Sequence, residues 1–332
     1  MKMSRKKIAA LLPVALLVAA CGSGQKDDAA GSADGSADGS APVTVAVSIY
    51  GQGMAPWTDS YGKRLEELAP ELKKQGTELI VSWADGTAQG QAAQVNSLLA
   101  QSPDAVAIYP LNSQATIPSF LRIQQAGASP VQAVIPPVDE ATDLIDAYIG
   151  GADEVATARA VAQAFVKNIA SEGKIAILRG PAGGSDNILR AQGFMEGIAG
   201  SNLEVVEDIN TDWGDQQKIH TDVSAVLQRH PDIVGLLTQY DGISIGARKA
   251  VDDANLDHEV HIANVVGGSC AGLELLKTGG ISLVAWHDAW TAAEETARLL
   301  PAIARGEDVP ANSFMEDPIV TTDDVGDRPC HS

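Results

Sequence analysis

The sequence has few aromatic residues, few cysteines and few basic residues. Aromatic residues make up 4% of the 332 residues, there are three cysteines, and 23 Lys and Arg stand against 43 Asp and Glu, which gives a formal charge of -20. A surface of this sign repels phosphate backbones and anionic lipid headgroups, so we expect no nucleic-acid partner and no peripheral membrane binding. The six histidines lack the spacing of metal ligands, and we expect no metal.

A long hydrophobic run is also missing. The N-terminal apolar run, residues 8–18, is shorter than the roughly 20 residues of a membrane-spanning helix, and Pro13 interrupts it. Four basic residues precede this run and small residues follow it, which is the order of a secretory signal. We therefore expect residues 1–20 to be a signal peptide and the mature protein to lie outside the cytoplasm.

The end of this leader has a second feature. Val18-Ala19-Ala20-Cys21 resembles the lipobox of bacterial lipoproteins, in which the cysteine is acylated. The alternative is an ordinary cleavage site beside an incidental cysteine. The next residues are rich in Gly, Ser, Ala and Asp and have almost nothing to bury. We therefore expect a lipid on Cys21, a flexible linker over residues 21–42, and anchoring to the cell membrane through that lipid.

Only Cys270 and Cys330 follow Cys21. In an oxidising compartment two thiols can form a disulfide. Two separate free thiols are equally compatible with the sequence, which does not give the distance between them.

Beyond the linker, short β-branched or apolar runs alternate with longer amphipathic segments. A strand pattern over residues 43–49 is followed by a helix pattern over 60–74 and a strand pattern over 78–82, and the alternation resumes after residue 151. About 290 residues are more than one hydrophobic core usually organises. We expect an α/β protein with two Rossmann-like domains, each a parallel sheet covered by helices.

In open parallel sheets, ligands bind beyond the carboxyl ends of the strands, so candidate residues follow each predicted strand. Asp85 follows the second strand and Asn112 the third, while Asp186 and Asn187 end a glycine-rich loop. Their side chains could bond the hydroxyls of a ligand. They could equally form turns or cap helices, because Asp and Asn readily bond nearby backbone.

Several of the few aromatic residues lie near predicted strand ends: Trp57, Trp213, Tyr240 and Trp286. Aromatic rings stack on the apolar faces of sugar rings, and the neighbouring Asp241 and His287 could bond hydroxyls. The alternative is that several of these rings fill the core or a domain interface, and we expect about half of them to be structural. We expect a pocket for a small polar solute and no cofactor.

Two motifs typical of enzymes lack their usual context. The loop over 180–187 has no Gly-Lys-Ser/Thr ending, so we expect no nucleotide there. The stretch 242–246 matches the Gly-x-Ser-x-Gly elbow of hydrolases, but residues 238–241 separate Ser244 from the preceding strand. We expect no enzyme. A serine hydrolase that uses Ser244 with a histidine such as His287 is the alternative.

The chain from residue 43 to about residue 320 resembles the periplasmic sugar-binding proteins of the ribose-binding type, the solute receptors of ABC importers. The segments that carry the resemblance are 51–57, 190–194, 230–233, 239–241 and 246–247. It implies two lobes that close on the ligand by a hinge motion, joined by three crossovers. The implied crossovers lie near 149–152, 286–288 and 317–319, which gives lobes of residues 43–150 plus 287–317 and 151–286 plus 318–332.

The resemblance also implies ligand-binding positions. They fall on Trp57, Asp85, Asn187 or Asp186, Trp213, Asp241, Trp286 and His287. Pro136-Pro137 stands where ribose-type members often have an Asp-Arg pair, and Ile188 stands near a frequent arginine. The loss of both charged groups argues against ribose and favours another pentose or hexose, an inositol-like polyol or, less strongly, a nucleoside.

The expected function follows from these features. A monomeric lipoprotein would capture a sugar or polyol outside the cytoplasm and deliver it to an ABC transporter permease and its ATPase. A signalling subunit that presents the same ligand to a sensor kinase or chemoreceptor is the alternative.

Overall fold

The computed structural model describes residues 41–182 and 184–331 of the chain. The predicted signal peptide, the predicted lipid anchor at Cys21 and residues 21–40 of the predicted linker lie outside the described residues. Among the described residues, no helix combines the length and the apolar character needed to cross a membrane.

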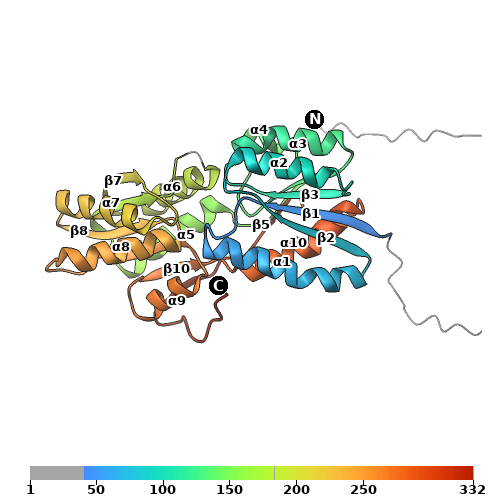
Figure 1. Ribbon diagram of the computed structural model, residues 1–332. Helices are drawn as coiled ribbons and strands as arrows, with labels where there is room; N and C mark the ends of the chain where they lie inside the picture. Colours follow the sequence, from blue (N-terminus) through green and yellow to red (C-terminus); the bar gives the residue numbers. More distant parts are fainter. Residues whose placement is uncertain (1–40, 183, 332) are drawn as a thin grey trace, which may run out of the picture. The chain divides into compact units, whose positions relative to one another are not determined.

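The first lobe is a six-stranded sheet with helices on both faces (Figure 1). Its strands lie in the order β11-β5-β4-β3-β1-β2, and neighbouring strands are parallel. They are β1 (Val43–Ile49), β2 (Thr77–Trp83), β3 (Ala105–Tyr109), β4 (Ser129–Ala133), β5 (Ala147–Gly151) and β11 (Asn312–Phe314). One face carries α1 (Pro56–Lys74) and α10 (Ala289–Ala304). The other carries α2 (Ala88–Leu99), the 3-10 helix η1 (Gln114–Thr116), α3 (Ile117–Gln125) and α4 (Asp139–Thr142).

The second lobe repeats this plan. Its six strands lie in the order β12-β10-β9-β8-β6-β7, and only the β10–β12 pair is antiparallel. They are β6 (Glu172–Arg179), β7 (Asn202–Asn210), β8 (Ile233–Thr238), β9 (His261–Gly267), β10 (Leu283–Trp286) and β12 (Ile319–Thr321). One face carries α5 (Glu154–Asn168) and α6 (Ser185–Ile198). The other carries α7 (Gln216–Arg229), α8 (Asp241–Ala254) and α9 (Cys270–Lys277).

The strands and helices follow from local sequence. Every residue of β3 and all but one of β1 are buried, which is why these strands are nearly continuous apolar runs. Three helices begin at an aspartate whose carboxylate accepts a hydrogen bond from a backbone N–H of the first turn. These caps are Asp153, Asp215 and Asp288. Each satisfies a donor that the helix itself leaves free.

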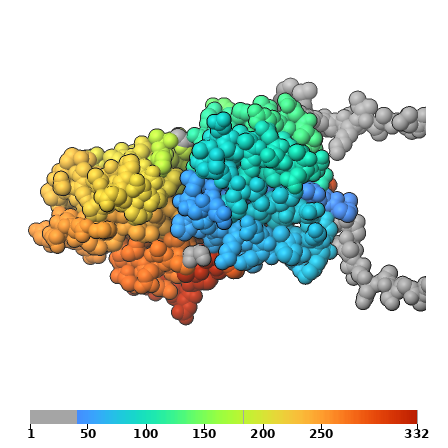
Figure 2. Space-filling view, viewed as in Figure 1, coloured from blue at the N-terminus to red at the C-terminus, as the bar shows by residue number. Residues whose placement is uncertain are grey.

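The chain passes between the two sheets three times, between β5 and α5, between β10 and α10, and between β11 and β12. The predicted α/β fold with two Rossmann-like lobes is therefore confirmed, with β12 as an antiparallel addition. The lobes also touch directly, since Gly214 of the second lobe lies close to the Met54 backbone of the first. In Figure 2 the blue part of the first lobe lies against the yellow and orange second lobe.

The C-terminal segment links the lobes a further time. Cys270, the first residue of α9, forms a disulfide with Cys330, and their Cα atoms are 4.9 Å apart. The next residue, His331, stacks on the ring of Trp290 at a centroid distance of 3.8 Å. Trp290 belongs to α10, so this tail contacts a helix of each lobe.

Candidate functional site

A cavity of about 380 Å³ lies between the two lobes. Its volume is within the range of roughly 300–1,000 Å³ that is typical of small-ligand pockets. In the first lobe its walls come from the ends of β1, β3, β4 and β5 or the residues that follow them. In the second lobe they come from the same end of β6, β7, β8, β9 and β10. The cavity is therefore at the carboxyl ends of both sheets, where parallel sheets bind ligands.

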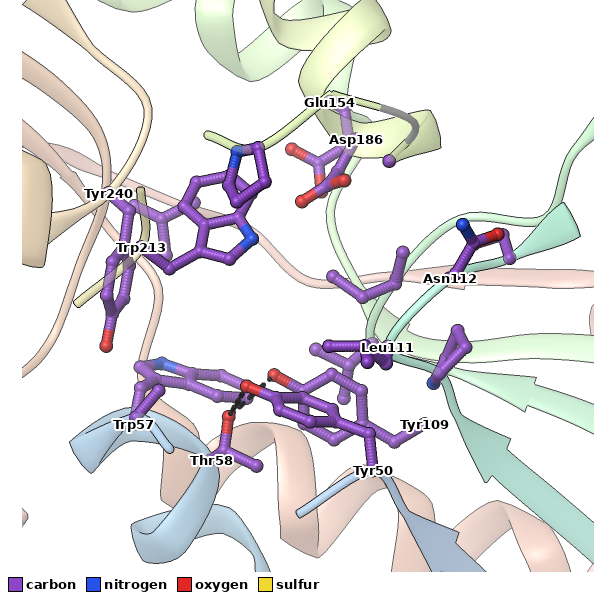
Figure 3. A pocket seen from close by; sticks show the side chains of 18 of the residues that line it. Tyr50, Trp57, Thr58, Tyr109, Leu111, Asn112, Glu154, Asp186, Trp213 and Tyr240 are labelled. Atoms are coloured by element: carbon purple, nitrogen blue, oxygen red, sulfur yellow. Dashed lines mark hydrogen bonds between the residues drawn. The ribbon is translucent and has the colours of Figure 1, made fainter. Parts of the chain in front are cut away.

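The first lobe contributes an aromatic floor, shown at the bottom of Figure 3. The indole of Trp57 is buried and lies nearly parallel to the rings of Tyr61 and His287, with centroids 5.9 and 5.2 Å away. Its Nε1 donates a hydrogen bond of 2.7 Å to the His287 carbonyl. These contacts fix the Trp57 ring in one orientation.

Two tyrosines extend this floor. The rings of Tyr50 and Tyr109 are perpendicular, with centroids 5.1 Å apart. Thr58 Oγ1 lies 2.8 Å from the Tyr50 hydroxyl and 3.1 Å from the Tyr109 hydroxyl, so the three hydroxyls form one hydrogen-bonded group. Burial raises the pKa of both phenols, which keeps them neutral and able to donate.

The second lobe contributes a facing aromatic wall made of Trp213 and Tyr240. Their rings are perpendicular, with centroids 6.0 Å apart. Trp213 lies directly over the backbone of Gly180, where an added Cβ would be 2.1 Å from the indole. Glycine at position 180 is therefore needed for the ring to take this place.

A charged group lies on the side of the cavity opposite Trp57 (Figure 3). Arg190 donates two hydrogen bonds, of 2.6 and 2.8 Å, to the two carboxylate oxygens of Glu154. Its Nη1 also lies 3.3 Å from Asp186 Oδ2. All three side chains are buried. Burial raises the pKa of Glu154, although the charge of Arg190 opposes the shift.

His287 lines the cavity beside the second crossover. Its Nδ1 lies 2.9 Å from the Oδ1 of Asp317, and both side chains are almost fully buried. Burial lowers the pKa of His287, but the charge of Asp317 and its hydrogen bond outweigh burial, so the pKa lies above its ordinary value. This pair joins two of the passages between the lobes.

Six of the residues that the sequence indicated line the cavity: Trp57, Asn112, Asp186, Trp213, Tyr240 and His287. Asn112 also acts as a turn former, because its Oδ1 accepts a hydrogen bond from the Ala115 N–H at 3.1 Å. The amide nitrogen of Asn112 has no hydrogen-bond partner among the described residues, which leaves it able to donate to a ligand.

Asp85 and Asn187 do not line the cavity. Asp85 is exposed, and its Oδ1 accepts hydrogen bonds from the Thr87 N–H and hydroxyl at 3.0 and 2.7 Å, so it shapes the start of α2. The Asn187 amide donates to the carbonyls of Gly180 and Pro181 at 2.7 and 2.8 Å. It thus holds the loop beneath Trp213 rather than facing the cavity. In both cases the turn-forming alternative describes the contacts observed.

Asp241 and Trp286 also lie behind the cavity wall. Asp241 is buried and accepts hydrogen bonds from the Asn264 amide at 2.7 Å and from the Ser269 N–H and hydroxyl at 3.0 and 2.6 Å. Burial raises its pKa to about 6. Trp286 packs in the core of the second lobe, with the Arg328 guanidinium 5.9 Å from its ring centroid.

Ser244 is not placed as a nucleophile. It lies in the first turn of α8, fully buried, and its Oγ bonds the Thr238 hydroxyl at 2.6 Å. A hydrolase elbow would instead expose the serine at the strand end. No group of three or more metal-binding side chains is present among the described residues.

Other lining residues were missed by sequence reasoning: Tyr50, Thr58, Tyr109, Glu154 and Arg190. Tyr50 and Tyr109 lie at the ends of β1 and β3, so the rule that ligands bind beyond strand ends could have identified them. No comparable signal marks Glu154 and Arg190, which lie inside helices α5 and α6.

Comparison with known proteins agrees with this geometry. A family model described as a periplasmic binding protein domain matches residues 45–308. The chain is 25% identical to a xylitol-binding protein of Mycolicibacterium smegmatis, over 96% of this chain and 85% of that protein. It is 29% identical to a ribose import binding protein of Bacillus subtilis, over 61% of this chain and 63% of that protein.

The solved structures give the same result for the fold. A Bacillus halodurans solute-binding protein of an ABC transporter, solved with bound myo-inositol, superposes with a TM-score of 0.77 at 21% identity. The match covers 87% of this chain and 97% of that structure. The family model spans most of the chain, including both lobes and the segments that carried the resemblance seen in the sequence. The chain therefore belongs to the periplasmic binding protein family, as the sequence predicted.

Proposed function

We propose that the protein captures a sugar or polyol in the cavity between its lobes, outside the cytoplasm, and delivers it to the permease of an ABC importer. The observation that carries this proposal is the cavity of about 380 Å³ with aromatic walls from both lobes. Aromatic faces stack on the C–H faces of a sugar, while the few polar groups bond its hydroxyls. The protein acts as a receptor and not as an enzyme.

The class of ligand is supported by the relatives. One is named for xylitol and another for ribose import, and both ligands are small and carry several hydroxyls. Ribose itself is disfavoured here, because Pro136-Pro137 stands where ribose-type members often have an Asp-Arg pair. Neither proline has a side chain that can bond a hydroxyl. We favour a linear or cyclic polyol or another simple sugar.

The two lobes would close on this ligand by a hinge motion at the three passages between the sheets. Closure removes water from the ligand's hydroxyls and brings Trp213 and Tyr240 over the floor formed by Trp57. The permease and its ATPase would then supply the energy of transport, with this protein acting as a monomer.

Ligand binding is tested by calorimetry and by thermal unfolding of the purified mature protein with pentoses, hexoses, inositols, linear polyols and nucleosides. At about a hundredfold excess over its dissociation constant, a true ligand stabilises the protein by roughly 2.7 kcal/mol. A single sugar or polyol that binds in the micromolar range or tighter supports the proposal. If the whole panel leaves the unfolding temperature and the heat signal unchanged, the proposal is wrong.

A matched pair of variants tests the location of the site. Gly180→Ala would place a methyl group 2.1 Å from the Trp213 indole and displace the ring, so affinity should fall at least tenfold. Gly214→Ala adds the same atom nearby, but its nearest neighbour is 3.6 Å away, and affinity should be unchanged. Equal affinities in the two variants would place the ligand elsewhere.

The proposed lipid anchor has its own test. Replacing Cys21 by Ser removes the thiol to which the lipid would be attached. In a bacterial host that processes lipoproteins, the unchanged protein should sediment with membranes, and the Cys21→Ser variant should be soluble. The same distribution for both proteins would refute the anchor without affecting the ligand site.

A further inference from the structure

The charges that line the cavity do not cancel. Arg190 bonds both carboxylate oxygens of Glu154, so the guanidinium charge is matched by that one partner. Asp186 approaches the same guanidinium only through Oδ2, at 3.3 Å. Its other oxygen, Oδ1, has no hydrogen-bond partner among the described residues. Figure 3 shows the Asp186 carboxylate at the edge of the cavity space.

Among the described residues, no other side chain that lines the cavity supplies an unpaired positive charge. His287 is paired with Asp317 at 2.9 Å, so their charges cancel when the imidazole is protonated. Arg190 is the only Lys or Arg among the described residues that line the cavity. The Asp186 side chain is 6% exposed. A carboxylate with so little water and no full counter-charge is costly to bury, and a cationic ligand would remove that cost.

The aromatic walls favour the same kind of ligand. Rings from both lobes line the cavity: Tyr50, Trp57, Tyr109, Trp213 and Tyr240. The faces of aromatic rings carry partial negative charge and attract ammonium groups, most strongly when water is excluded. The overall charge of -20 also raises the concentration of cations near the protein. Three independent features thus point to a positive charge in the ligand.

We propose that the cavity prefers a polyhydroxylated ligand that carries one protonated amine, such as an amino sugar or amino polyol, and that Asp186 is the residue that selects it. This inference rests on the proposed function and narrows its ligand class. The ammonium donates to Asp186 Oδ1, while the hydroxyl-bearing carbons stack on the aromatic walls. A neutral hydroxyl can donate to the same oxygen, but it leaves the carboxylate charge unmatched.

The test compares three matched pairs of probes that differ in one amine: glucosamine with glucose, glucamine with sorbitol, and scyllo-inosamine with scyllo-inositol. Affinities are measured by calorimetry at neutral pH, where these amines are protonated. In at least one pair the amine should bind at least about tenfold more tightly, since a hydrogen bond to a charged group exceeds one to a neutral group. If no amine outbinds its neutral partner, the inference is wrong.

The Asp186→Asn variant assigns the preference to one residue. The asparagine keeps the size of the side chain and removes its charge, while Glu154 still pairs with Arg190. The ratio of amine to neutral affinity should fall to within about twofold of one, as the charge-assisted part of the bond disappears. Asp143→Asn is the control, because Asp143 is exposed and does not line the cavity, and its ratio should equal that of the unchanged protein.

The outcomes separate this inference from the proposed function. Neutral polyols that bind as tightly as their amines overturn the inference and leave the proposed receptor function intact. A ratio that is unchanged in Asp186→Asn overturns the role of Asp186. Urea unfolding of each variant shows whether it is folded, and Asp186→Ser serves as a second uncharged variant if Asp186→Asn unfolds.

Discussion

At the scale of single residues, the ion pair of Glu154 and Arg190 is a deeply buried charged contact at the cavity, with side chains 2% and 7% exposed. Glu154→Gln keeps the shape but leaves the guanidinium charge without its main partner. Breaking a buried pair in this way typically costs 3–5 kcal/mol, so we expect the free energy of unfolding to fall by about 3 kcal/mol. Urea unfolding measures the change.

The matched control is Glu196→Gln. Glu196 pairs with Arg159 at 2.5 Å, but both side chains are about 40% exposed. Such exposed pairs contribute little to stability, because water screens their charges. If Glu154→Gln is no more destabilising than Glu196→Gln, the buried pair does not hold this part of the fold.

Residue type alone could not separate the carboxylates that face the cavity from those that do not. Asp85 and Asp186 both follow a strand, but β2 is the edge strand of its sheet, and a short side chain on the loop after it does not reach the cavity. Trp213 also follows an edge strand, β7, and its longer side chain reaches across Gly180. Whether each of these residues lines the cavity depends on the length of its side chain and on the position of its strand in the sheet. The sequence shows the length of the side chain but not the order of the strands.

At the scale of elements, periodicity located the long helices and strands and missed the short ones. The predicted helix over 60–74 begins at Pro56, which puts Trp57 in its first turn instead of in a loop. Proline is favoured at that position because it has no N–H to satisfy there. The strands β11 and β12 have three residues each, too few to show any period.

The C-terminal segment is the element whose role is easiest to test. It is tied to α9 by the Cys270–Cys330 disulfide, which closes a loop with a sequence separation of 60. A loop of that length restricts the unfolded chain, and the chain-entropy model gives roughly 4 kcal/mol of stabilisation. We expect a Cys270→Ala/Cys330→Ala variant to lose stability of that order in denaturant unfolding.

Reductant provides the control for this prediction. Dithiothreitol should destabilise the unchanged protein by a similar amount and leave the double variant unaffected. The disulfide holds the C-terminal segment where His331 stacks on Trp290. After reduction of the disulfide, this segment should also become sensitive to carboxypeptidase. A reductant effect of equal size in both proteins would show that the disulfide is not its cause.

At the scale of the whole molecule, length and alternation were enough to predict two α/β lobes, and the family resemblance implied the cleft between them. They could not predict the balance of charge in that cleft, because it arises where α5 and α6 bring Glu154, Asp186 and Arg190 together. Glu154 belongs to α5, whereas Asp186 and Arg190 belong to α6, and strand β6 lies between the two helices in the sequence. Such a grouping exists only in the folded chain.

The pH dependence of folding is a property of the whole molecule to which one buried group contributes clearly. Burial raises the pKa of Asp241 to about 6, against the hydrogen bonds from Ser269 and Asn264 that favour its charged form. In the unfolded chain the pKa is about 3.9. The folded protein therefore binds the proton of the Asp241 carboxyl more tightly than the unfolded chain does. The resulting contribution to the free energy of unfolding is complete below about pH 4 and is lost as the pH rises through about 6.

This loss should amount to on the order of 2–3 kcal/mol between pH 4 and 7. We expect the stability difference between the unchanged protein and Asp241→Asn to decrease by that amount over this range, measured by urea unfolding at several pH values. Groups that both proteins share, including His287 with its raised pKa, cancel in the difference. A difference that stays level or increases with pH would mean that the hydrogen bonds from Ser269 and Asn264 outweigh burial and keep Asp241 charged throughout.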